Sequence, residues 1–125
     1  MSDKEVLREY RRLSEEEAML ERQLNAEPDP LEDASVRSHR LQALRTIKEE
    51  KTQARARLTR RFEQVVCRSP NARQRLVLRQ YYGIPMTDQK IAEGFGCTSK
   101  AINKLRNDFL RAIDKADAEA DGKEG

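Results

Sequence analysis

The sequence predicts an all-α protein, with a long antiparallel, coiled-coil-like hairpin of two helices followed by three shorter helices. Ala, Glu, Lys, Leu and Arg supply 64 of the 125 residues, a share typical of long helices and coiled coils. Apolar residues recur every three or four positions in long stretches without proline or glycine, which is the spacing of one helix face. Only 25 residues are Leu, Ile, Val or Phe, so we expect a thin core along narrow seams.

The first helix is expected to begin almost at the N-terminus, because Ser2 and Glu5 form a capping-box pattern. Its apolar seam follows heptad spacing, with Glu17 at the one polar position. The seam residues are Val6, Tyr10, Leu13, Leu20 and Leu24. Pro28 and Pro30 end this helix, since proline cannot continue the hydrogen-bond ladder, and the chain is expected to turn back.

The second helix is expected over residues 33–67, a stretch without proline or glycine. Its apolar stripe consists of Leu41, Leu44, Ile47, Leu58, Phe62, Val65 and Val66. Antiparallel pairing of the two helices would place Glu17 opposite Lys48 or Lys51, and we hypothesise that this ion pair fixes the register. The second helix outlasts the first by about two turns of 3.6 residues, so its last apolar residues need a partner from the segment that follows.

Three shorter helices are expected next, each with its own start signal. The predicted helices span 70–82, 87–93 and 99–115, with N-caps at Ser69, Thr87 and Thr98. Glycines at 83, 94 and 96 separate them. Residues 116–125 are predicted to be a disordered acidic tail.

The last two of these helices carry a pattern that resembles the helix-turn-helix family of DNA-binding proteins. Apolar residues, one alanine and one glycine occupy all seven positions that the family pattern specifies. These are Ile91, Ala92, Phe95, Gly96, Cys97, Ile102 and Leu105. The resemblance implies two domains, a helical hairpin over 1–68 and a helix-turn-helix domain over 69–115, and duplex DNA as a partner.

A narrower resemblance covers residues 70–113. The run PNARQRLVLRQYYG, followed by MTDQKIA and GCT, is similar to region four of bacterial sigma-70 factors. That family recognises the promoter's minus-35 element and contacts the β-flap of RNA polymerase, so the resemblance implies RNA polymerase as a further partner. An N-terminal helical hairpin in front of this region is similar to small phage and prophage sigma-like regulators.

The outer face of the last helix is the candidate DNA-reading surface. The family commonly has Arg, Glu, Arg and Gln at four reading positions that here are Ser99, Lys100, Asn103 and Lys104, so minus-35 specificity is not implied. Asn103 is the candidate for a base contact, because an amide pairs with adenine in the major groove. The complete candidate set is Thr98, Ser99, Lys100, Asn103, Lys104, Asn107, Arg111, Arg73 and Arg79.

The charge distribution supports a polyanionic partner but has a second explanation. Residues 34–115 carry a net charge of +12, whereas residues 1–33 carry −6 and residues 116–125 carry −3. A basic middle suits a surface that neutralises phosphates. It is equally typical of an ordinary solvated helix face.

Function is therefore predicted as a DNA-binding transcriptional regulator, encoded by a phage or mobile element, that also contacts RNA polymerase. Two alternatives stay open at this point. The first is a protein-binding inhibitor or co-regulator of RNA polymerase or another host enzyme, with the hairpin as its working surface. The second is a DNA-packaging recognition subunit, which would form a ring-sized oligomer, whereas a homodimer through the hairpin would suit a regulator.

Other classes of function are not expected. A single histidine, His39, and two cysteines separated by 30 positions do not make a zinc site or a disulfide framework, so no metal or cofactor is predicted. We expect Cys67 and Cys97 to be reduced, buried apolar side chains. No nucleophile, base and stabiliser come together in the sequence, which argues against an enzyme. No apolar run approaches the ~20 residues of a membrane span, so we expect a cytoplasmic protein without a membrane partner.

Overall fold

The computed structural model describes residues 1–124, and the side chains of residues 1–120. Over this range the chain forms helices and no strands, which confirms the all-α class. The elements are α1 (Asp3–Asn25), α2 (Ala34–Val66), α3 (Ala72–Leu78), a π-helical turn η1 (Arg79–Gly83), α4 (Asp88–Phe95) and α5 (Ser99–Glu124).

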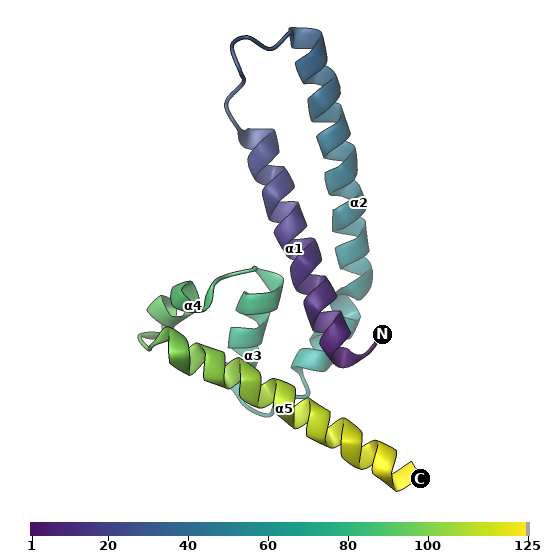
Figure 1. Cartoon of the computed structure of the whole chain (residues 1–125), viewed down its shortest axis with the longest axis vertical. Helices are drawn as coiled ribbons and strands as arrows, with labels where there is room; N and C mark the ends of the chain where they lie inside the picture. The colour runs from purple at the N-terminus through teal and green to yellow at the C-terminus, as the bar shows by residue number, and fades with distance from the viewer. Residues whose placement is uncertain (125) are drawn as a thin grey trace.

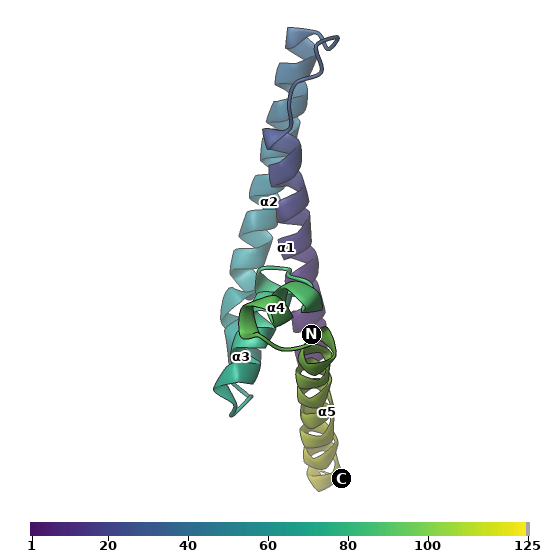
Figure 2. The same ribbon diagram turned by 90° about the vertical axis from the view of Figure 1, so that its left-hand side faces the viewer.

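Helices α1 and α2 lie side by side and run in opposite directions (Figures 1 and 2). The predicted capping box at the start of α1 is present, with Ser2 and Glu5 satisfying each other's backbone N–H groups. Asp33 caps α2, where its carboxylate accepts hydrogen bonds from two N–H groups of the first turn. These caps fix where the two long helices begin, as the sequence predicts.

The register of this α1–α2 pair differs from the prediction. Glu17 faces Arg55, at 3.7 Å, and not Lys48 or Lys51, so the pairing is displaced by about one helical turn of 3.6 residues. The cause is the packing nearer the N-terminus, where the ring of Tyr10 stacks on that of Phe62 with centroids 4.0 Å apart and an interplanar angle of 10°. Stacked rings in a buried core contribute free energy beyond their buried area, whereas a single ion pair at 3.7 Å gains little against the desolvation of its charges.

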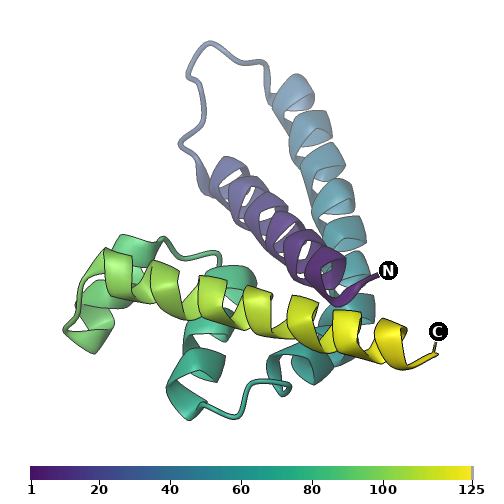
Figure 3. The same ribbon diagram turned by 60° about the horizontal axis from the view of Figure 1, so that its bottom comes forward.

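The main core lies where the foot of the α1–α2 pair meets the rest of the chain. The last apolar residues of α2 are covered there, as expected, by residues from α3, η1 and α5. The buried members are Val6, Leu7, Tyr10, Phe62, Val65, Val66, Leu78, Tyr82, Phe109 and Ile113. We call this cluster the base, and Figure 3 shows α5 crossing it.

The start of α3 also departs from the prediction. Asn71 caps the helix by accepting a hydrogen bond from the Gln74 N–H at 3.0 Å, so Ser69 and Pro70 lie before it. Ser69 is buried instead and donates its hydroxyl hydrogen to the Gln74 side chain. A buried hydroxyl needs such a partner, which removes Ser69 from the capping position.

The acidic C-terminal segment is helical, which corrects the prediction of a disordered tail over 116–125. Helix α5 continues to Glu124, and Gly125 lies outside the described residues. The segment is rich in alanine, the best helix former. Ion pairs connect this end of α5 to α1 and α2: Lys4 with Asp114 at 2.5 Å, just before the segment, and Arg68 with Asp117 at 3.2 Å, within it.

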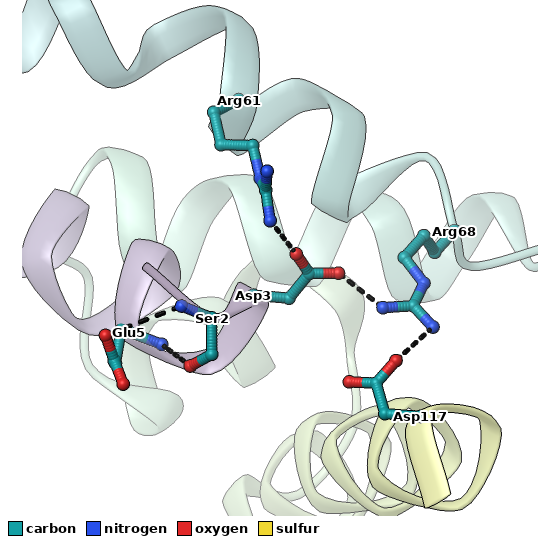
Figure 4. A network of polar contacts seen from close by, with 6 residues as sticks. All are labelled: Ser2, Asp3, Glu5, Arg61, Arg68 and Asp117. Carbon is teal, nitrogen blue, oxygen red and sulfur yellow. Dashed lines mark hydrogen bonds and ion pairs between the residues drawn. The ribbon is translucent and has the colours of Figure 1, made fainter. Parts of the chain in front are cut away.

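Figure 4 shows how the second of these ion pairs extends into a network. Asp3 lies between Arg61 and Arg68, and Arg68 also reaches Asp117. Burial raises the pKa of the Asp3 carboxyl, but hydrogen bonds from the two arginines outweigh it, so the net pKa is lowered. The network joins the start of α1, the end of α2 and the far part of α5.

One of the two cysteine predictions is wrong. Cys67 is exposed, because it follows the last turn of α2 at a point where the chain leaves the core. Cys97 is half-buried and packs against the α4–α5 contact.

Candidate nucleic-acid interface

The connection between α4 and α5 is a tight turn with defined caps at both ends. Thr87 caps α4 by accepting a hydrogen bond from the Lys90 N–H at 3.2 Å. Gly96 ends it in the left-handed conformation, with φ of 67° and ψ of 34°, a region that a residue with a Cβ enters only with strain. Thr98 then starts α5, its hydroxyl accepting from the Ala101 N–H at 3.2 Å.

A second, smaller core holds α4 and α5 against α3. Its buried members are Val77, Ile91, Ala92 and Ile102. Phe95, Cys97 and Leu105 are partly buried and pack against them. Six of the seven pattern positions therefore lie in one cluster, and the seventh, Gly96, supplies the turn. Helix α4 continues through Phe95, where the prediction ended at residue 93, and α5 begins at Ser99 as predicted.

The outward face of α5 carries the predicted polar residues. Ser99, Lys100, Asn103, Lys104 and Arg111 are exposed there. Asn107 is half-buried, and its amide donates a hydrogen bond to the Asn103 side-chain oxygen at 2.9 Å. The contact leaves the amide hydrogens of Asn103 free to donate, and a neighbour one turn away helps to hold its side chain in place.

Two of the cations on this face share one carboxylate. Asp108 lies 3.1 Å from the Lys104 ammonium and 3.8 Å from the Arg111 guanidinium. Both cationic side chains nevertheless remain about three-quarters exposed, at 76% and 77%. Surface pairs of this kind contribute little free energy. A stronger anion can therefore displace Asp108 from both cations at little cost.

Arg73 extends this basic surface onto α3. Its guanidinium carbon lies 5.1 Å from the centroid of the Phe95 ring. Arg73 and Lys104 also line one shallow groove together with Ala101, Leu105 and Asp108. The structure thus brings Arg73 beside the face of α5, although the two residues are 31 positions apart in the sequence.

Arg79 does not join that surface. Its guanidinium makes a two-pronged hydrogen bond with Glu63 of α2, with N–O distances from 3.0 to 3.2 Å. The hydrogen bonds that Arg79 donates to Glu63 raise the pKa of its guanidinium against the opposing effect of burial. Among the predicted residues, Arg79 therefore serves the contact between η1 and α2.

Sequence reasoning missed two residues. Lys90 is exposed on α4 and has no carboxylate within ion-pair distance among the described residues, so it adds a free cation beside the turn. Arg106 is buried to 8% exposure and makes a bidentate pair with Asp88 at 2.7 and 3.0 Å. Its position four residues after Ile102 places it on the apolar stripe of α5, a signal that was available in the sequence.

The charge on Arg106 is retained despite this burial. Burial lowers the pKa of its guanidinium, but the hydrogen bond with Asp88 and the nearby Tyr81 outweigh that effect and raise it. Asp88 is the first residue of α4, where a carboxylate also complements the helix dipole. The pair therefore joins the start of α4 to the middle of α5.

The described part of the chain contains no group of three or more His, Cys, Asp or Glu residues arranged to hold a metal ion. Over residues 1–124 no helix combines the length and the apolar character needed to cross a membrane. The chain matches no family model, no curated protein and no solved structure.

Proposed function

We propose that the chain is a DNA-binding transcriptional regulator in which α4 and α5 act as a helix-turn-helix and α5 enters the major groove. One observation supports the proposal. The helix that follows the turn, α5, presents cations and amides on its outward face, and the glycine of the turn adopts the left-handed conformation. A recognition helix in such a motif presents its N-terminal residues to base edges. We extend the proposal to a phage or mobile-element regulator that also contacts RNA polymerase.

The residues take distinct roles in this proposal. Asn103 reads a base, since its amide can donate to and accept from adenine. Lys100, Lys104 and Arg111 contact phosphates, with Lys90 and Arg73 on either side of the helix. Thr98 and Ser99 bring the start of α5, with its free N–H groups, close to the DNA backbone.

Binding to a mixed-sequence DNA duplex, followed by fluorescence anisotropy from low to physiological salt, tests the proposal. If about 4 to 6 phosphates are neutralised, log K falls with log salt at a slope of about −4 to −5. The double variant Lys100→Ala/Lys104→Ala is expected to weaken binding and reduce the slope by about 2.

The matched control removes two positive charges elsewhere. Arg57 and Arg60 are exposed on α2, without ion pairs among the described residues, and their double alanine variant is expected to bind DNA like the wild type. Equal losses in the two double variants would mean that only net charge matters, and the assignment to α5 would be wrong. Absence of binding at low salt would favour a protein target.

Asn103→Ala separates base reading from phosphate contact. We expect it to reduce discrimination among sequences, measured by competition between selected and random duplexes, more than it reduces overall affinity. A uniform loss across all duplexes would instead assign Asn103 to the DNA backbone.

A second candidate function, association through the α1–α2 hairpin, has its own observation. Four large apolar residues are exposed on that hairpin, in its helices and its connecting loop. They are Met19, Leu31, Val36 and Ile47. Light scattering distinguishes the outcomes: a dimer supports two DNA half-sites, a ring-sized oligomer supports the packaging subunit, and a monomer removes both.

A further inference from the structure

Tyr81 of η1 connects the two cores of the molecule. It is the one side chain that packs against both the base and the smaller α3–α4–α5 core among the described residues. Helix α4 packs on α5 and η1, and η1 packs on α1. The contact between the α1–α2 pair and α4 therefore runs through η1, with Tyr81 at its centre.

Arg11 of α1 holds Tyr81 from one side. Its guanidinium carbon lies 3.8 Å from the centroid of the Tyr81 ring. The same guanidinium donates hydrogen bonds to the backbone carbonyls of Tyr81 and Met86, the latter at 3.2 Å. Arg11 thus contacts both the π-helical turn and the segment that leads into α4.

Arg106 of α5 holds the same ring from the other side. Its guanidinium carbon lies 3.7 Å from the ring centroid. Two guanidinium groups this close to one centroid cannot share a face of the ring, so Tyr81 is enclosed between them. Each cation has its own carboxylate, Glu15 for Arg11 at 2.7 Å and Asp88 for Arg106 at 2.7 Å, which offsets their mutual repulsion.

We propose that Arg11, Tyr81 and Arg106 are positioning residues for DNA binding, because this stack sets the orientation of α4 relative to α5 and to the α1–α2 pair, while α5 also meets the base directly. The inference rests on the proposed function. Arg11 stands on α1 and its contacts are with η1 and the loop before α4, so its effect on DNA is exerted through α4. The first helix of the chain thereby becomes a determinant of how the last helix meets the duplex.

The chain offers matched controls for both ends of the stack. Arg12 is the neighbour of Arg11 on the same helix, but it pairs with Glu9 and Glu16 on the exposed side. Tyr81→Phe keeps the ring and both cation–π contacts, whereas Tyr81→Leu removes them. Arg11→Lys keeps the charge but lacks the planar fork that stacks and donates twice.

The experiment measures binding to the mixed-sequence duplex across salt concentrations, with hydrogen exchange of peptides from 84–98 in the same proteins. Arg11→Ala, Arg11→Lys and Tyr81→Leu are expected to bind about threefold to tenfold more weakly at every salt concentration. Their salt slopes should stay at the wild-type value, because no phosphate contact is lost. Exchange in 84–98 should become faster, while Arg12→Ala and Tyr81→Phe behave like the wild type.

The outcomes separate this inference from the proposed function. If the wild-type protein does not bind DNA, the proposed function is wrong. Hydrogen exchange of peptides from 84–98 in the variants then decides by itself whether the stack holds α4 in position. Where the wild type binds, unchanged affinity in Arg11→Ala and Tyr81→Leu overturns the inference. A salt slope reduced by Arg11→Ala also overturns it, since Arg11 would then contact phosphate directly.

Discussion

The base of the molecule and the outer part of the α1–α2 pair are both helical, but they differ in what holds them. At the base, ten apolar residues from α1, α2, α3, η1 and α5 are at most 5% exposed. In the outer part, which we define as residues 21–51, not one residue is buried. The two regions of one continuous pair of helices therefore have different sources of stability.

The outer part depends on local contributions. The Asp33 cap, the Arg40–Glu32 pair and the Lys48–Glu21 pair act at its surface, and exposed pairs contribute little each. Isolated helices are marginal without packing. We infer that α1 and α2 remain helical there because they extend from helices that the base has already fixed, so local opening should be easiest toward residues 26–33.

The largest expected effect comes from truncating a buried aromatic residue at the base, compared with truncating an exposed aliphatic residue in the outer part. Phe62→Ala at the base should lower the free energy of unfolding by about 3–5 kcal/mol, because the ring is buried and stacks on Tyr10. Ile47→Ala in the outer part, where the side chain is 42% exposed, should cost about 0.5 kcal/mol or less. Urea unfolding of both variants checks this, and similar losses would mean that the outer part also has a tight core.

A smaller effect is expected at the boundary between the two regions. Glu17 lies on the seam and meets Arg55 at a loose 3.7 Å, with one carboxylate oxygen and the Arg55 Nε buried without a hydrogen-bond partner. Replacing both partners, Glu17→Leu with Arg55→Met, should be neutral or stabilising by about 1 kcal/mol, since hydrophobic replacement of a whole ion pair often is, whereas removing one partner alone leaves a charge unpaired. Thermal melting gives the sign, and a clear destabilisation would restore the register role for this pair.

The smallest expected effect is a pH-dependent loosening of the polar network at the base. The pKa of Asp3 is lowered in the folded chain, so its contribution is complete above the ordinary value of about 3.9 and is lost as the pH falls through the folded value. The thermal midpoints of wild type and Asp3→Asn should therefore differ at pH 7 and converge as the pH falls through the folded pKa of Asp3. Glu21→Gln, which removes an exposed pair in the outer part, is the control, and an equal pH effect there would contradict the comparison.

The extents of α1 and α2 could be predicted from the sequence because the signals are local. Capping residues at Ser2, Thr87 and Thr98, and proline or glycine at the breaks, depend on neighbours within a few positions. The turn at Gly96 belongs to the same group, since its left-handed conformation follows from residues 91–97.

What the sequence did not predict depends on contacts between distant segments. The register followed the Tyr10–Phe62 stack and not Glu17, and no local pattern ranks those two interactions. Arg79 turned toward Glu63 because η1 lies against α2, which could not be known before the base was assembled. The roles of Arg11 and Arg106 could be predicted only if the position of Tyr81 were known, because Tyr81 packs between helices from both ends of the chain.

The unburied outer part also means that the chain's continuity there contributes little to the fold. A backbone cut in the loop between α1 and α2 would leave every buried contact of α1 with the base in place. Covalent connection through that loop keeps α1 at a high effective concentration, so separate fragments must also offset the translational and rotational entropy that association costs. Fragments 1–29 and 30–125 should reassemble when mixed at high concentration, giving a two-piece protein in which α1 can be exchanged, labelled or titrated separately.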